Sequence, residues 1–135
     1  MQIEQRTTFI HADDFGITPG QAKAILSLSS SCGGSGALNS VSIFANSPAF
    51  YEAASLAQPY VRRGVLRVCL HLNLVEGPSV ADPKRIPLLV NERGMFDNNF
   101  MGLFKLGITN KGEAFNQLVI ECRSCLLYTS PSPRD

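Results

Sequence analysis

Short apolar runs alternate with longer stretches of helical periodicity through the first 75 residues of the chain. Strand candidates occupy residues 8–12, 40–45 and 66–72, and helix candidates occupy residues 19–31 and 47–58. A strand-helix-strand-helix-strand order favours parallel strands joined by helical crossovers, because parallel pairing needs a long connection. The sequence therefore predicts an α/β fold.

Local signals predict where the two helices begin. Thr18 is a typical N-cap and Pro19 suits the first helical position, where a missing N–H costs no hydrogen bond. Pro48 is expected to open the second helix in the same way. Three strands with two crossovers leave an open edge, so we expect residues 1–124 alone to be unstable or insoluble. A cooperative thermal transition of that segment would contradict this expectation.

The pattern changes beyond Glu76. Gly-Pro and X-Pro pairs indicate a loop, residues 91–94 indicate a turn, and residues 96–106 form an apolar cluster without a clean period. A last helix is predicted over residues 111–124. Its expected apolar stripe has i, i+3, i+4, i+7 spacing and consists of Phe115, Leu118, Val119 and Cys122.

Composition limits the class of protein. The chain has 135 residues, enough for one ordinary domain, with 44% hydrophobic residues, 17% charged residues and a net charge of +1. Scattered, balanced charges do not favour nucleic acid as a partner. No apolar stretch approaches the roughly 18 residues of a membrane span, and the first residues lack a signal-peptide pattern. The cytoplasm is therefore the expected compartment.

The last eleven residues, 125–135, resemble the translation of a transposase sequencing adapter. We therefore expect residues 1–124 to be the native part of the chain, with the natural protein continuing beyond Ser124. Excluding these eleven residues also weakens the functional interpretation of the C-x-x-C motif formed by Cys122 and Cys125, because Cys125 falls in the suspected adapter. Cys32 and Cys69 are expected to be buried or partly buried thiols.

Asp13 and Asp14 are adjacent carboxylates at the predicted end of the first strand. Like charges this close raise one pKa unless a cation intervenes, so the pair indicates a shared proton or a metal ion beside a general base. The alternative is an ordinary turn, in which one Asp caps the following helix and the other is solvated.

His71 lies at the predicted end of the third strand. The carboxyl ends of parallel strands meet at one rim, so His71 and the two aspartates can converge there. Carboxylate and neutral imidazole suit Zn, Mn, Fe or Mg, and imidazole favours the transition metals. The alternative for His71 is a structural histidine hydrogen-bonded to the backbone.

Three blocks of the sequence carry a family resemblance. They are FIHADDFG at residues 9–16, SIFANSPAF at residues 42–50 and LHLNLVEGP at residues 70–78. In this order and spacing they resemble the N-terminal blocks of the YdjC-like carbohydrate deacetylases, also called the ChbG/HpnK group. The resemblance covers most of residues 8–94.

The resemblance implies a metal-dependent hydrolase on a distorted (β/α) TIM-like barrel, here truncated, that removes acetyl groups from N-acetylated oligosaccharides. It implies that Asp14 and His71 bind a divalent ion, Mg²⁺ or alternatively Zn²⁺ or another transition metal. Asp13 is then the general base. This division between the two aspartates follows other metal deacetylases that have an Asp pair.

The chain departs from the family pattern at two places. The third protein ligand is expected from a His-rich block downstream of the last helix, and the only histidines here are His11 and His71. His11 stands where the family commonly has Asn and is not expected to replace that ligand. We therefore expect the fragment itself to be inactive. A non-catalytic sugar-binding or regulatory domain with the same fold is the alternative, and homo-oligomerisation is left open.

Overall fold

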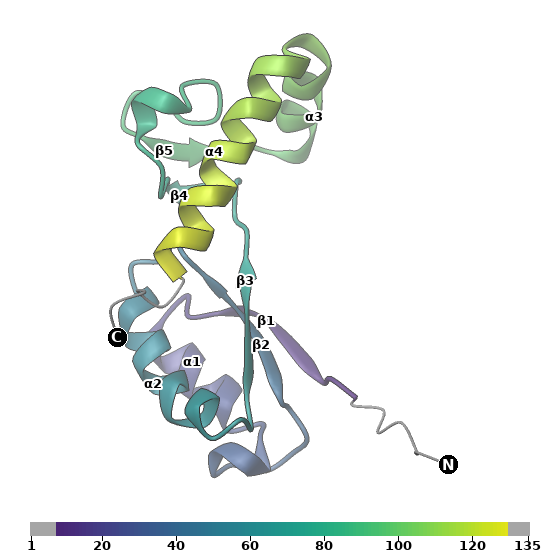
Figure 1. Cartoon of the computed structure of the whole chain (residues 1–135), viewed down its shortest axis with the longest axis vertical. Helices are drawn as coiled ribbons and strands as arrows, with labels where there is room; N and C mark the ends of the chain where they lie inside the picture. Colours follow the sequence, from purple (N-terminus) through teal and green to yellow (C-terminus); the bar gives the residue numbers. More distant parts are fainter. Residues whose placement is uncertain (1–7, 130–135) are drawn as a thin grey trace. The chain divides into compact units, whose positions relative to one another are not determined.

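The computed structural model describes residues 8–129, which fall into two compact units with separate hydrophobic cores. The first unit consists of residues 8–43 with Ala49–Cys69, and the second of Phe44–Pro48 with residues 70–129. The predicted strand-helix-strand-helix-strand order is confirmed (Figure 1). Its elements are β1 (His11–Phe15), α1 (Pro19–Leu26), β2 (Ser40–Phe44), α2 (Phe50–Arg62) and β3 (Arg67–His71).

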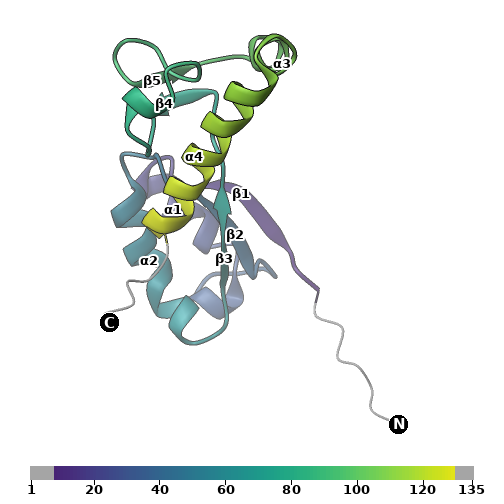
Figure 2. The same ribbon diagram turned by 45° about the horizontal axis from the view of Figure 1, so that its top comes forward.

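In the first unit, one layer of helices covers one face of the strands. β1 and β2 pair in parallel, and the strand order of the sheet is β1-β2-β3. α1 and α2 lie together on the same side of β1 and β2 in both views (Figures 1 and 2). The core between the layers is made of Phe15, Val41 and Ile43 from the strands and Ala22, Leu26, Ala53 and Ala57 from the helices.

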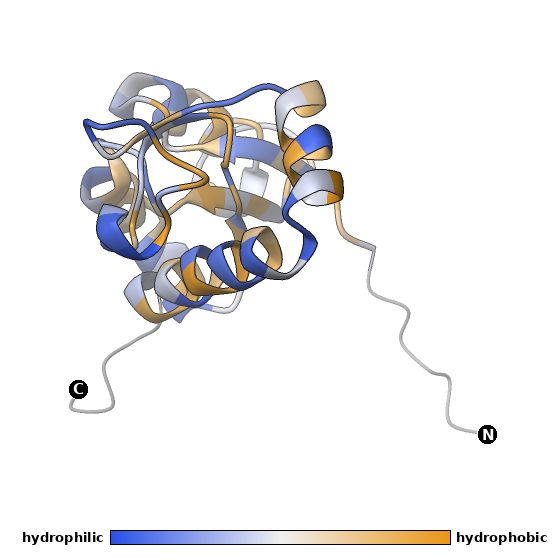
Figure 3. Ribbon diagram, turned by 90° about the horizontal axis from the view of Figure 1, so that it is seen from above, coloured by the Kyte–Doolittle hydropathy of each residue, from blue (hydrophilic) through white to orange (hydrophobic). Residues whose placement is uncertain are grey.

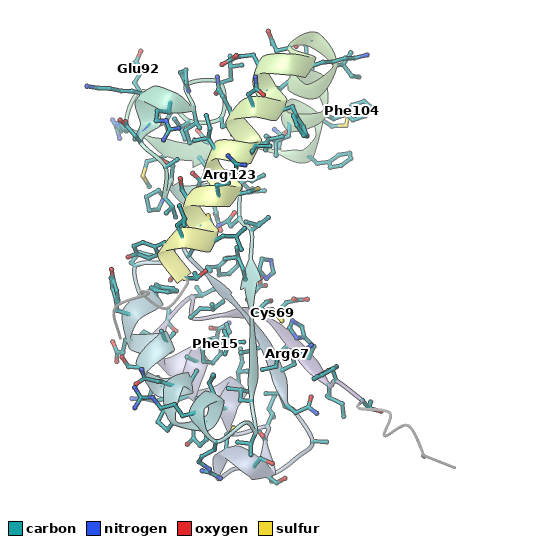
Figure 4. The ribbon with its side chains drawn as sticks, viewed as in Figure 1. Phe15, Arg67, Cys69, Glu92, Phe104 and Arg123 are labelled. Atoms are coloured by element: carbon teal, nitrogen blue, oxygen red, sulfur yellow. The ribbon has the colours of Figure 1, made fainter. Side chains whose placement is uncertain are left out.

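Alternation along the strands separates an apolar face from a polar one. Figure 4 shows Phe15 on the side of the strands that faces the helices, whereas Arg67 and Cys69 lie on the other side. Phe15 is completely buried, and Arg67 and Cys69 are exposed. The expectation that Cys69 would be buried or partly buried was therefore wrong, because its position in β3 places it opposite the core.

α1 begins as predicted and ends earlier than expected. The Thr18 side chain accepts a hydrogen bond from the Gln21 N–H, and Pro19 occupies the first turn. The helix stops at Leu26, where a serine-rich stretch follows and a short 3₁₀ turn forms at Ser30–Cys32. Serine side chains compete for backbone groups and disfavour helix interiors, which explains the shorter helix.

α2 differs from its prediction at both ends. It begins at Phe50 with Ala49 as N-cap, so Pro48 precedes the helix instead of opening it. It continues through Pro59 to Arg62. Pro59 lies in the last turn, where its missing N–H removes only the helical bond to the carbonyl of Ser55. The apolar face of the helix, packed on the first core, outweighs that loss.

The second unit contains a small antiparallel pair and two helices. β4 (Glu76–Pro78) pairs with β5 (Met95–Asp97), a 3₁₀ turn forms at Pro83–Arg85, and α3 (Phe100–Thr109) and α4 (Lys111–Thr129) follow. α3 was not predicted. Asn99 caps it, with its side chain accepting from the Gly102 N–H. No residue of α3 is buried, and Figure 3 shows apolar residues along both α3 and α4.

The buried face of α4 matches the predicted stripe only in part, since Leu118 packs against the second core. Phe115 is 65% exposed, and the buried residues are Ala114, Gln117, Glu121 and Cys125. Both carboxylate oxygens of Glu121 accept backbone N–H bonds, from Val80 at 3.0 Å and Ala81 at 2.9 Å. The Gln117 side-chain oxygen accepts from the Leu88 N–H at 2.8 Å. Polar bonds to the loop, which hydrophobic periodicity does not register, therefore decide which face is buried.

Gly16 lies directly after β1, at a point where the chain closely approaches α2. Its φ is +91°, and a Cβ there would lie 2.8 Å from the Ala53 Cβ. Gly16→Ala is expected to lower the free energy of unfolding by about 2 to 4 kcal/mol through backbone strain and overpacking. Urea unfolding of the whole protein that carries these residues measures the change.

Gly33→Ala is the matched control. Gly33 has a similar φ of +87°, but a Cβ there would meet no atom within 4 Å. This variant should lose only about 1 kcal/mol, the strain contribution alone. Equal losses in the two variants would show that the close approach to Ala53 is not costly.

Candidate metal and catalytic site

A β-bulge in β1 presents both members of the acidic pair. The register with β2 shifts between Ala12 and Phe15, so Asp13 and Asp14 together lie opposite Ser42 alone. In a regular strand, adjacent side chains point to opposite faces and one aspartate would enter the core. The extra residue of the bulge avoids this, since Ala12 and Phe15 both pack on the core while Asp13 and Asp14 are exposed.

Asp14 lies in the bulge with a left-handed backbone conformation, which occurs in one type of β-bulge. Its φ is +60°, and it is the only described residue other than glycine with a positive φ. Asp and Asn tolerate this left-handed region better than other non-glycine residues. The predicted alternative of a helix cap does not apply, because Thr18 caps α1 and both aspartates belong to β1.

Two side chains contact the same oxygen of Asp13. The Ser42 hydroxyl donates to Asp13 Oδ1 at 2.9 Å, and His11 Nε2 lies 3.3 Å from that oxygen. The other ring nitrogen, Nδ1 of His11, lies 2.7 Å from the Ser40 hydroxyl. The Asp13 side chain remains 70% exposed, so the carboxylate is both held and open to solvent.

Gln21 holds the turn that follows the acidic pair. Its side-chain oxygen accepts from the backbone N–H groups of Gly16 at 3.0 Å and Ile17 at 3.1 Å. Its side-chain nitrogen donates to the Asp14 carbonyl at 2.6 Å. This residue was missed in the sequence, although Thr18 followed by Gln at the third position has the spacing of a capping box. Here the Gln side chain reaches beyond the cap residue to the bulge itself.

His71 ends β3 and belongs to the second unit. Its ring lies 4.4 Å from the Phe44 ring, centroid to centroid, at an angle of 47°. Asn73 organises the loop that follows, since its side-chain oxygen accepts from the N–H groups of Val75 and Glu76. The imidazole is thus half-buried against an aromatic ring at the start of an ordered turn.

The described residues supply few metal ligands. Asp13 and Asp14 lie in the first unit and His71 in the second, each at the end of a strand of the same three-stranded sheet. Between residues 8 and 129, no group of three or more His, Cys, Asp or Glu side chains is placed to hold a metal ion. Carboxylate and imidazole fit Mg²⁺, Mn²⁺ or Zn²⁺ by donor type, with coordination incomplete.

The C-x-x-C motif is structural in character. Cys125 is buried and its thiol donates to the Glu121 carboxylate at 3.5 Å. Burial, together with the Glu121 charge, raises the pKa of Cys125 to about 12, and burial also raises the pKa of Cys122. Thiols with raised pKa are poor nucleophiles and poor redox groups. Of the segment 125–135, residues 125–129 continue α4, and the remainder lies outside the described residues.

Among the described residues, no helix combines the length and apolar character needed to cross a membrane.

Three comparisons with known proteins each find relatives of this chain. The profile of the family described as YdjC-like protein matches residues 8–123. A carbohydrate deacetylase from Thermoanaerobacter pseudethanolicus is 33% identical over 93 residues, which is 67% of this chain and 34% of that protein. A crystal structure from Enterococcus faecalis V583, named provisionally as a cellobiose-phosphate cleavage protein, is 26% identical with a TM-score of 0.66. The alignment covers 90% of this chain and 44% of that one.

These similarities assign the α/β segment to a family of proteins. The chain belongs to the YdjC-like family, as its three sequence blocks predicted. It spans about a third of the length of the curated relative.

Proposed function

We propose that this chain is part of a metal-dependent carbohydrate deacetylase, which hydrolyses acetamido groups on N-acetylated oligosaccharides. The observation that carries the proposal is the bulge in β1, which turns two adjacent carboxylates away from the core at the end of a strand. Family membership and the deacetylase relative support the substrate class. The barrel architecture, with residues 1–124 as its N-terminal part, belongs to the same proposal.

In this proposal, Asp14 and His71 hold a divalent ion, Mg²⁺ or alternatively Zn²⁺. When bound, the ion polarises the acetamide carbonyl and lowers the pKa of a water molecule. Two side chains of this chain complete the coordination only in part, so a further ligand or water has to supply the rest.

Asp13 is the proposed general base. Its carboxylate takes a proton from the attacking water, whose oxygen forms a bond to the acetamide carbon. The C–N bond then breaks, and the proton held by Asp13 passes to the leaving nitrogen. The products are acetate and the free amino sugar. The exposure of Asp13, together with the two groups that contact one of its oxygens, suits this role.

Asp14→Asn tests the proposed metal ligand with the backbone preserved. Asn tolerates a φ of +60°, so the melting temperature should stay close to that of the wild type. Loss of an outer-shell partner lowers metal affinity by about 10- to 100-fold. Loss of Asp14, a proposed ligand, should lower it by more. Isothermal titration of the whole protein that carries these residues with Mg²⁺ or Zn²⁺ measures the affinity.

Asp82→Asn is the control for the loss of one exposed carboxylate, since Asp82 lies in the loop of the second unit and caps only a short 3₁₀ turn. It should bind metal as the wild type does. Wild-type metal affinity in Asp14→Asn would remove Asp14 from the proposed ligand set.

A further inference from the structure

Four polar side chains form a connected cluster on the face of β1 and β2 that is turned away from the core. His11 and Asp13 come from β1, and Ser40 and Ser42 come from β2. The parallel register places His11 opposite Ser40. Ser40 and Ser42 are 2% and 4% exposed, so their hydroxyl groups need partners within the protein. The cluster lies entirely in the first unit.

The chemistry of the neighbouring groups sets which ring nitrogen of His11 carries the hydrogen. An ionised carboxylate only accepts, so the hydrogen of neutral His11 has to lie on Nε2, which is 3.3 Å from Asp13 Oδ1. Nδ1 then has a lone pair and accepts from the Ser40 hydroxyl at 2.7 Å. The opposite tautomer would direct a lone pair at the carboxylate. The Asp13 carboxylate therefore selects the ring form, and the Ser40 hydroxyl, which can donate or accept, complements it as the donor.

We infer that His11 is a positioning residue for Asp13, an inference that rests on the proposed role of Asp13 as general base. A carboxylate whose side chain is 70% exposed samples several rotamers unless donors hold it. A general base acts only within hydrogen-bond reach of the proton that it removes. His11 and Ser42 meet at one oxygen, Oδ1, and so fix the orientation of the group. Ser40 in turn fixes the imidazole ring.

Kinetics of the whole protein that carries these residues test the inference. With divalent metal present, acetate release from an N-acetylated oligosaccharide is followed in wild type, His11→Ala and His11→Asn. His11→Ala should lower kcat by about 10- to 100-fold, since misplacing a reacting group by about 1 Å costs this much, while KM stays within about twofold. The Asn amide can donate toward the carboxylate, so His11→Asn should recover most of kcat.

The alternative roles of His11 give different results. A purely structural brace between β1 and β2 would lower the melting temperature of His11→Ala without changing kcat. A metal ligand would lose bound metal in both variants, as measured by titration. Wild-type kcat in His11→Ala, or equal loss of kcat in His11→Ala and His11→Asn, would overturn the positioning role.

Asp13→Asn separates failure of this inference from failure of the proposed function. If Asp13→Asn retains wild-type kcat, the proposed base is wrong and the positioning role falls with it. If Asp13→Asn is inactive while His11→Ala has wild-type kcat, only the positioning role is overturned.

A spectroscopic measurement tests the contact between His11 and Asp13 without any activity. In the whole protein that carries these residues, the ring N–H signal of His11 is identified as the signal that His11→Asn lacks. Under mildly alkaline conditions, a ring N–H proton held by Asp13 should be visible by NMR and assigned to Nε2. It should disappear in an Asp13→Ala background through exchange with water. A ring proton that is invisible in both backgrounds, or that is assigned to Nδ1, would overturn the inferred contact.

Discussion

Asp13→Asn should lower kcat for acetate release by about 10²- to 10⁴-fold, the range that a positioned general base contributes. An amide cannot accept the proton of the attacking water, whereas it can still accept the hydroxyl of Ser42, so the bulge should be preserved. Bound metal and melting temperature are therefore expected to match the wild type. Kinetics and metal titration on the same preparation measure the two effects separately.

The control is Asp97→Asn, which removes an exposed carboxylate from β5 in the other unit. It should leave kcat unchanged. Loss of metal in Asp13→Asn together with retention of metal in Asp14→Asn would reverse the proposed roles of the two aspartates. Full activity in Asp13→Asn would rule out Asp13 as the base.

Glu121→Ala should lower the free energy of unfolding by about 3 to 5 kcal/mol, because it removes two hydrogen bonds to a charged acceptor. The carboxylate is completely buried and accepts from the backbone of Val80 and Ala81. Without it, these two N–H groups lose their partners, and the Ala81 bond lies in the buried interior. Urea unfolding of the whole protein that carries these residues measures the total, and hydrogen exchange at Val80 and Ala81 localises it.

Two further variants of α4 serve as comparisons for the loss of stability in Glu121→Ala. Glu121→Gln keeps one side-chain oxygen, so it should lose about half as much. Glu113→Ala removes an exposed carboxylate two turns earlier that accepts only from Gln117 among its described partners, and it should cost about 1 kcal/mol. Unchanged amide exchange at Val80 and Ala81 in Glu121→Ala would show that the carboxylate does not hold the loop.

The order of elements could be predicted because apolar periodicity and capping residues act locally. Thr18 and Pro19 mark the start of α1 in the sequence as they do in the structure. The ends of elements depend on tertiary packing, and here prediction failed. The helix around Pro59 continues because its apolar face is packed, and the buried face of α4 is selected by Glu121 and Gln117. The choice in α4 depends on a loop 29 to 41 residues away.

The candidate site could likewise be predicted from the sequence only in part. Residue type and position were enough to nominate Asp13, Asp14 and His71. The contacts of Asp13 with Ser42 and of His11 with Ser40 span 29 residues, and they depend on the register of β1 against β2, which the sequence does not specify. The bulge likewise depends on how β1 pairs with β2, so the sequence alone did not predict it. Gln21 could have been found from its capping-box spacing, whereas the metal ion and its ligands stay a prediction.

Metal-dependent acetate release by the whole protein is the most direct test of the central claim, that the acidic pair of β1 belongs to a metal-dependent deacetylase centre. Turnover of an N-acetylated chito-oligosaccharide should stop when a chelator removes the metal and return when Mg²⁺ or Zn²⁺ is added back. Asp13→Asn should remain inactive after metal is restored. Turnover that is insensitive to the chelator, or sugar binding without any acetate release, would contradict the claim.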